Sequence, residues 1–171
     1  VSTGWSSGVL TVSGLVITGT KGNYTITATD TTDGYDADTN ADGVRAGTSG
    51  TVVLGYGAAT DLVVSAPATA TNGAAMGDVT VTAKDSGGNT VEDFSDAVSL
   101  AASGAGYLTG TATGSLNATT HKVAVSTGWS SGVLTVTGLV ITGTKGNYTI
   151  TATDTTNGYD ADTNVTGVRA G

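Results

Sequence analysis

The residues with the clearest chemical potential lie in one acidic loop. Asp38, Asn40 and Asp42 alternate with other residues and are followed by Gly43, which fits the opening of a calcium-binding loop. Alternating oxygen side chains converge on one hard cation, and the glycine permits the tight turn. The candidate ligands are Asp36, Asp38, Asn40 and Asp42. Calcium is the one cofactor that the sequence suggests, and none is required. A solvated acidic linker is the alternative interpretation.

Four Asn-x-Ser/Thr sequons are candidate glycosylation sites: Asn23, Asn117, Asn147 and Asn164. Asn23 and Asn147 fall on the outward face of an alternating strand pattern, where a sugar could be accommodated. The motif is short and arises by chance, so unmodified asparagine is the alternative.

Residues 4–8 and 128–132 both match the G-x-S-x-G pattern of hydrolases. That motif requires a strand before the serine and a helix after it. Here a β-type run follows instead, and the only histidine of the chain is His121. A loop between strands explains the pattern better than a nucleophile does, so we expect no enzyme.

Composition narrows the function classes further. The chain has 171 residues with 14 acidic and 6 basic side chains, a net charge of −8 and a pI of about 4.1. An acidic surface repels phosphates, so nucleic acid is not an expected partner. No run of 18 apolar residues occurs, so membrane insertion is not expected either. The absence of an initiator Met and of a signal peptide suggests a mature product or an excised fragment.

The strongest signal is an internal repeat. Residues 125–171 repeat residues 1–47 with an offset of 124. The two copies differ only at Ser13/Thr137, Asp33/Asn157, Ala41/Val165 and Asp42/Thr166. The last difference removes one candidate calcium ligand from the second copy. A period of 124 residues exceeds that of a solenoid and fits one β-sandwich domain plus a linker.

The elements that must position these residues are short strands. Residues 23–29, 147–153 and 78–84 alternate strictly between apolar and polar side chains, which predicts half-buried strands. The last of them places Val79, Val81 and Ala83 inward. Further strands are expected at 50–54, 62–65, 98–101, 122–126, 133–136 and 139–142, with a turn at 85–89 and a bulge at Gly138. No apolar spacing of helical period occurs, so we expect an all-β sandwich.

Residues 79–91, followed by Val98-Ser99-Leu100, resemble the bacterial Ig-like repeats of invasin-like and filamin-like surface proteins, in which a strand ends in a D-x-x-G-N-x-V turn. Residues 146–152 resemble the closing strand of those repeats, with its G-x-Y-T-I-T-A pattern. The resemblance implies tandem Ig-like β-sandwich modules. It also implies an extracellular or cell-surface location in a stalk, fibre or surface layer.

The repeat predicts two modules. Residues 1–57 form the C-terminal part of one Ig-like repeat with a linker, and residues 58–171 form the second repeat. Because the first module is incomplete within this chain, we expect residues 1–47 to pair with strands outside residues 48–124 of their own chain. An adjacent repeat or another protomer would supply those strands. The expected function is a structural module that assembles head to tail with copies of itself. The alternative is an adhesin module that binds carbohydrate or a cell-surface ligand.

Overall fold

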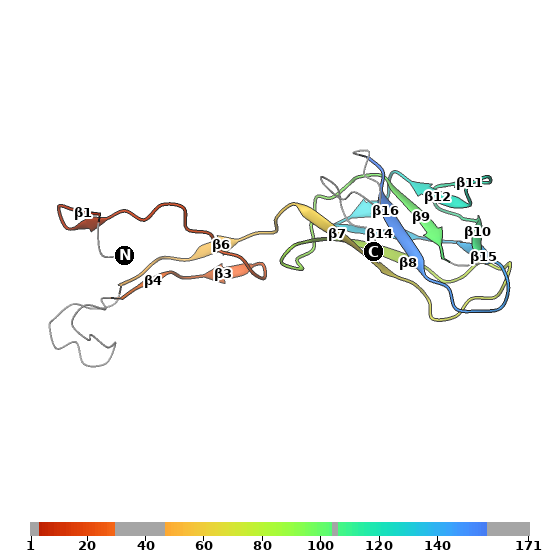
Figure 1. The fold of residues 1–171 in the computed structure, drawn as a ribbon, viewed down its shortest axis with the longest axis horizontal. Coiled ribbons are helices and arrows are strands. Elements are labelled where there is room, and N and C mark those ends of the chain that lie inside the picture. The colour runs from red at the N-terminus through yellow and green to blue at the C-terminus, as the bar shows by residue number, and fades with distance from the viewer. Residues whose placement is uncertain (1–3, 30–46, 104–105, 157–171) are drawn as a thin grey trace. The chain divides into compact units, whose positions relative to one another are not determined.

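The computed structural model describes residues 4–29, 47–103 and 106–156. These residues form strands and turns without a helix, so the predicted all-β class is confirmed. The chain divides into two compact units, Val1–Gly55 and Tyr56–Gly171 (Figure 1). Each unit is described separately below.

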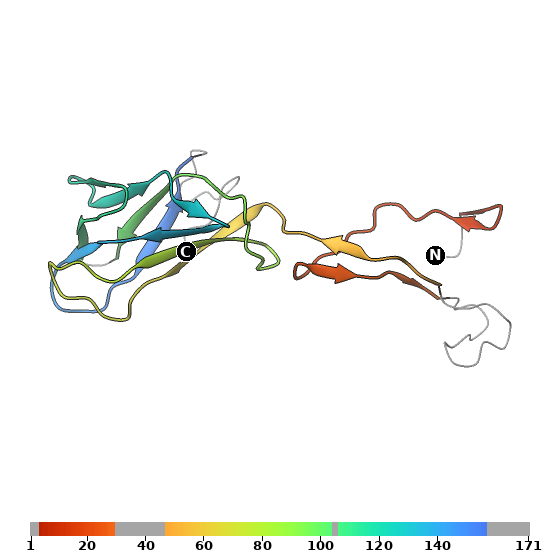
Figure 2. The same cartoon turned by 180° about the vertical axis from the view of Figure 1, so that it is seen from behind.

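The second unit contains two four-stranded antiparallel sheets (Figures 1 and 2). One sheet has the order β11-β12-β9-β16 and contains β9 (Val98–Ala102), β11 (Ser115–Asn117), β12 (Lys122–Val125) and β16 (Ile150–Asp154). The other has the order β13-β14-β8-β7 and contains β7 (Ala59–Ser65), β8 (Val79–Asp85), β13 (Trp129–Ser130) and β14 (Val133–Val136). A third, two-stranded sheet pairs β10 (Tyr107–Gly110) with β15 (Val140–Thr142).

One hydrophobic core joins the sheets of the second unit. Strand β8 alternates between buried and half-buried residues, and Val79, Val81 and Ala83 are each 0% exposed, as predicted. The same core takes Leu134 from β14 and Leu100 from the other sheet. Two sheets that share one buried apolar layer are consistent with a β-sandwich.

The bulge predicted at Gly138 is instead a change of sheet. Strand β14 pairs with β8, whereas β15, which begins two residues after Gly138, pairs with β10. Gly138 has a φ of +64°, and a Cβ there would lie 2.7 Å from the Cβ of Ala112. The glycine is therefore needed both for its backbone angle and for a close approach at the point where the chain crosses over.

The first unit is a set of two-stranded pairs. Strand β1 (Trp5–Ser6) pairs with β2 (Val9–Leu10), β3 (Gly22–Tyr24) pairs with β6 (Val52–Leu54), and β4 (Thr27–Ala28) pairs with β5 (Gly47–Thr48). No described residue of this unit is buried. The predicted strand at 23–29 occurs as the two short strands β3 and β4, and the strand predicted at 50–54 is shortened to β6.

One expectation about pairing was wrong. Residues 22–28 pair with residues 47–54 of their own chain, and most of that second range lies inside the segment 48–124 that we had excluded as a partner. The physical reason is that a strand has two edges and can pair along both. Residues 47–54, most of which belong to the excluded segment, pair along one edge of residues 22–28. The other edge, along which β16 meets β9 in the second unit, has no counterpart of β9 within the described part of the first unit.

Candidate functional site

The described part of the repeat adopts two environments in the same chain. Leu139 is 0% exposed, whereas Leu15, its counterpart in the first copy, is 64% exposed. Val136 is 0% exposed and its counterpart Val12 is 44% exposed. Seven of the nine exposed large hydrophobic side chains of the described residues lie in the first unit, namely Trp5, Val9, Val12, Leu15, Val16, Ile26 and Val53. The first unit therefore presents as surface the side chains that form the core of the second.

The local geometry of the two copies is nevertheless the same. Trp5 pairs with Leu10 as Trp129 pairs with Leu134. The turn between the paired strands has positive φ angles in both copies, 51° and 76° at Ser7 and Gly8 and 48° and 73° at the equivalent residues. These angles fit the tight turns that match the twist of a β-hairpin. The hairpin geometry is therefore encoded locally, whereas its burial differs between the two units.

Two equivalent pairs of glycines differ in how closely other residues approach them. A Cβ at Gly132 would lie 2.4 Å from the backbone oxygen of Val91, and the oxygen of Gly132 accepts a hydrogen bond from the amide of Ala83 at 2.9 Å. A Cβ at Gly8, the same position in the first copy, would meet nothing within 4 Å. The same contrast holds between Gly138 and Gly14. The first copy thus keeps glycines whose close approach is used only in the second copy.

Trp129 shows how the hairpin is anchored when the sandwich is complete. Its indole Nε1 donates a hydrogen bond to the backbone oxygen of Asp96 at 2.9 Å, and its ring meets Phe94 edge-on with a centroid distance of 4.7 Å. Both partners belong to the segment between β8 and β9, for which the first unit has no counterpart. Trp5, the equivalent indole, is 62% exposed.

Two carboxylates meet at the same end of the second unit. Asp154 is 1% exposed, and its Oδ1 accepts a hydrogen bond from the amide of Thr156 at 2.9 Å. Burial, and then the negative charge of Asp154, raise the pKa of Asp96 above its ordinary value. Ionisation of Asp96 therefore costs stability.

Asp85 fixes the turn that carries the family resemblance. Its carboxylate is buried and accepts hydrogen bonds from the amide of Gly57 at 2.7 Å, from that of Gly87 at 2.9 Å and from that of Asn89 at 2.8 Å. The bond from Gly57 and then the side-chain amide of Asn89 lower the pKa of Asp85 from 3.8 to about 2. The sequence predicted the turn but not this role. The D-x-G-x-N spacing was the signal that could have revealed it.

The sequence-predicted sites fall in different places. Asn23 in β3 and Asn147 before β16 are exposed. Asn117 ends β11, and its Oδ1 accepts hydrogen bonds from the amides of Thr119 and Thr120, each at 2.9 Å. Its side chain therefore shapes a turn. Glycosylation of these residues remains a prediction.

The loop predicted to bind calcium, with Asp36, Asp38, Asn40 and Asp42, lies outside the described residues, as does the sequon at Asn164. Within the described ranges, no group of three or more His, Asp or Glu side chains is arranged to hold a metal ion. Ser130 lies in β13 and is followed by a hairpin turn and β14, so the strand-to-helix geometry of a hydrolase elbow does not occur there.

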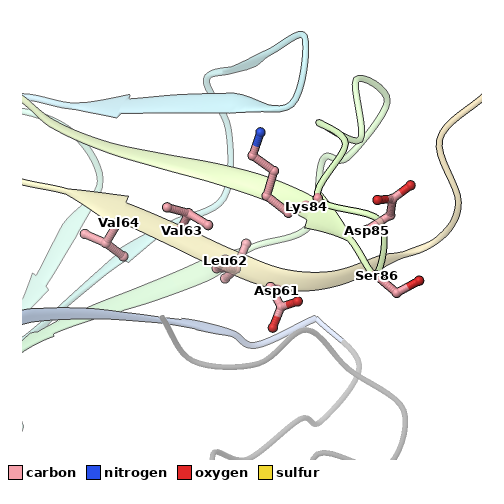
Figure 3. A pocket seen from close by; sticks show the side chains of 8 residues that line it. Asp61, Leu62, Val63, Val64, Lys84, Asp85 and Ser86 are labelled. Carbon is pink, nitrogen blue, oxygen red and sulfur yellow. The ribbon is translucent and has the colours of Figure 1, made fainter. Parts of the chain in front are cut away.

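A surface depression over β7 and the end of β8 is lined by Asp61, Leu62, Val63, Val64, Lys84, Asp85, Ser86 and Gly88 (Figure 3). Its charged side chains do not converge on one point: Lys84 and Asp61 point away from each other in Figure 3. The Lys84 Nζ donates to the Thr90 hydroxyl at 2.9 Å, and the Asp85 carboxylate is occupied by the turn. Lys84 and Asp85 are therefore engaged by neighbouring residues rather than by each other.

Comparisons of the chain with protein-family models, with curated proteins and with solved structures find no match. Within the described ranges, no helix has the length and apolarity needed to cross a bilayer.

Proposed function

We propose that this chain is a structural repeat module of an extracellular filament, stalk or surface layer, built from tandem Ig-like β-sandwiches. The observation that carries the proposal is the pair Leu15 and Leu139, which have the same sequence context but are exposed and buried, respectively. Fully burying a side chain of this size is worth about 1.5–3 kcal/mol. Several large apolar side chains of the first unit are exposed, and exposed apolar surface of this kind favours an interaction site.

The sequence of the second unit identifies that partner. Residues 125–156 complete their core with residues 56–124, which supply β7 to β12. The partner of residues 4–29 is accordingly a segment with the sequence of residues 56–124. This chain contains two copies of the completing half and one copy of the half that accepts it. We infer that the copy of 56–124 that covers residues 4–29 belongs to a neighbouring module or protomer.

Completion of each module by its neighbour would join the modules head to tail. Each module that accepts a completing half presents another one to its neighbour, so the contact is heterologous and extends in one direction. Near-identical copies give identical contacts, and length is then gained by addition. The extracellular location rests on the resemblance to bacterial surface repeats, and labelling of intact cells with an antibody against the module tests it.

Tryptophan accessibility tests the completion directly. Residues 48–124 are placed ahead of Val1, which continues the repeat, and Trp129→Phe leaves Trp5 as the only tryptophan of the chain. We expect the emission of Trp5 to shift to the blue and its quenching by acrylamide to fall to the level of Trp129 in a Trp5→Phe chain. The matched control carries Asp at the added copies of Val79 and Val81, which are core residues in the second unit.

The proposal fails if Trp5 stays as accessible in the extended chain as in the control. For the assembled state, electron micrographs of chains with several repeats should show unbranched rods that lengthen by a constant increment per repeat. Compact particles without that increment would contradict a filament or stalk.

A further inference from the structure

The closing strand of the repeat pairs with different partners in the two units. In the second unit, β16 stands at the end of its sheet and pairs only with β9. In the first unit, the equivalent residues form β3 and β4 and pair with β6 and β5. The sequence of the strand is the same in both cases, since residues 22–28 and 146–152 are identical.

Backbone hydrogen bonds show that these partners use opposite edges. In the second unit, Thr149 accepts a bond from the amide of Ser103 at 2.9 Å and donates its own amide to the Ser103 hydroxyl at 2.9 Å. In the first unit, Ile26 accepts from the amide of Ser49 at 2.8 Å and donates to the Ser49 hydroxyl at 2.9 Å. Ile26 is equivalent to Ile150, one residue further along the strand than Thr149.

Successive residues of a strand direct their backbone groups to opposite edges. Thr149 and Thr155, which donates to the oxygen of Ala97 at 2.8 Å, therefore mark the edge that faces β9. Ile150 and Ala152 direct their backbone groups to the other edge, which ends the sheet among the described residues. The two partners thus do not compete, and one strand can bind both.

We propose that the outer edge of β16 binds a second copy of the segment 47–54, supplied by a further repeat unit, so that the four-stranded sheet gains a strand beyond β16. This inference rests on the proposed function. The first unit supplies the register: Ser49 would lie opposite Ile150, Val52 opposite Tyr148 and Val53 opposite Asn147. The junction strand of one module would then close the sheet of the preceding one.

Two features of the segment favour it as the occupant. A serine mediates the pairing at both edges, because the Ser49 amide and hydroxyl make the same two bonds to Ile26 that those of Ser103 make to Thr149. An uncovered edge is also a template for unspecific pairing, and native sheets cover such edges. The first unit shows this sequence covering this edge of the identical strand.

Cysteine crosslinking tests the register, because the chain has no cysteine of its own. The full chain is extended after Gly171 by a copy of residues 48–57. Asn147→Cys is combined with Cys at the added copy of Val53, or, as the matched control, at the added copy of Val52, which points to the other face of the strand. Directly opposed strand positions lie within the span of a disulfide. The positive control is the pair Asn23→Cys and Val53→Cys in the unextended chain. These two positions are directly opposed in the structure, so their disulfide yield is the reference.

We expect a yield near that reference for the Val53 position and at least ~10-fold less for the Val52 position. Amide exchange at Ile150 and Ala152 should slow by at least ~10-fold on extension, since paired amides exchange only on opening. Equal yields at the two positions, or unchanged exchange at these amides, would overturn the inference. Nothing is added ahead of Val1 here, so this result and that of the Trp5 experiment can fail independently.

Discussion

Truncating the equivalent leucines Leu15 and Leu139 distinguishes the effect of burial on stability from that of local sequence. Leu139 is 0% exposed in the core of the second unit, and its backbone oxygen is bonded by the amide of Met76 at 2.8 Å whatever its side chain is. Leu139→Ala therefore removes only buried methyl groups. Such a change costs about 2–5 kcal/mol, depending on how far the cavity collapses. Leu15→Ala removes the same atoms from a side chain that is 64% exposed, and should cost no more than about 0.5 kcal/mol.

The assay is urea unfolding of the full chain. Leu139→Ala is measured in a Trp5→Phe background, in which emission reports Trp129 and hence the second unit. Leu15→Ala is measured in a Trp129→Phe background, in which emission reports Trp5 and hence the first unit. With a slope of about 1–3 kcal/mol per molar urea, a cost of about 2–5 kcal/mol for Leu139→Ala should lower the midpoint by roughly 0.7–5 M. With the same slope, Leu15→Ala should shift the midpoint by no more than about 0.5 M. The slope should stay constant in both variants, because a changed slope signals altered compactness rather than a lost contact.

A third arm applies Leu15→Ala to the chain extended by residues 48–124 ahead of Val1, with Trp5 as the probe. The cost should then rise to that of Leu139→Ala. The reasoning is refuted if Leu15→Ala is equally mild in the presence of a folded extension. It is refuted in the other direction if Leu15→Ala already costs 2–5 kcal/mol without one, because residues 4–29 would then be buried in the unextended chain.

Other predictions concern single contacts. Gly132→Ala should lower the thermal midpoint of the second unit by much more than Gly8→Ala lowers that of the first. Both glycines have φ near +75°, but only Gly132 faces the Val91 oxygen. Equal decreases would mean that backbone strain alone matters. Asp85 has a pKa of about 2 when folded against 3.8 as the reference, so its stabilisation is present above pH 4 and is lost as the pH falls toward 2. Asp85→Asn should remove that part of the acid dependence in unfolding titrations and should speed chymotrypsin cleavage after Tyr56, whereas an unchanged acid limb would contradict it. The raised pKa of Asp96 has the opposite sign, since ionisation costs stability that returns as the pH falls through the folded value. Asp96→Asn should therefore stabilise the second unit at neutral pH, and a lower midpoint there would argue against repulsion from Asp154.

The sequence predicts the strands that alternate strictly, and it fails where tertiary context decides. Val79, Val81 and Ala83 are buried as expected because a period of two leaves only one apolar face. Gly138 was expected to mark a bulge, since sequence alone does not distinguish a bulge from a crossover between sheets. The pairing of residues 22–28 with 47–54 was missed because the acidic loop between them carries no strand pattern, and hairpins are normally read from short turns.

The candidate site was less accessible to sequence reasoning than the fold. Asp85 was read as one residue of a polar turn, although its carboxylate also binds the amide of Gly57, which is 28 positions away. No local pattern reports a contact at that separation. By contrast, the repeat itself predicts that the first copy needs further strands, because residues 125–156 pack against residues 56–124 and the first copy has the same sequence at all but a few positions.

The backbone conformation of the first copy is already formed without a covering partner, and this affects how such modules would join. The first copy already has the hairpin that pairs Trp5 with Leu10, and the Tyr24 hydroxyl already bonds the oxygen of Thr20 at 2.5 Å, as Tyr148 bonds Thr144 in the complete sandwich. A partner would therefore supply burial rather than backbone conformation. Because ordering of loops and side chains is a principal cost of association, a preformed completing half loses less on joining than an unfolded one would. The same preformed surface is exposed until it is covered, which favours completion by a module in the same chain, where the effective concentration is highest.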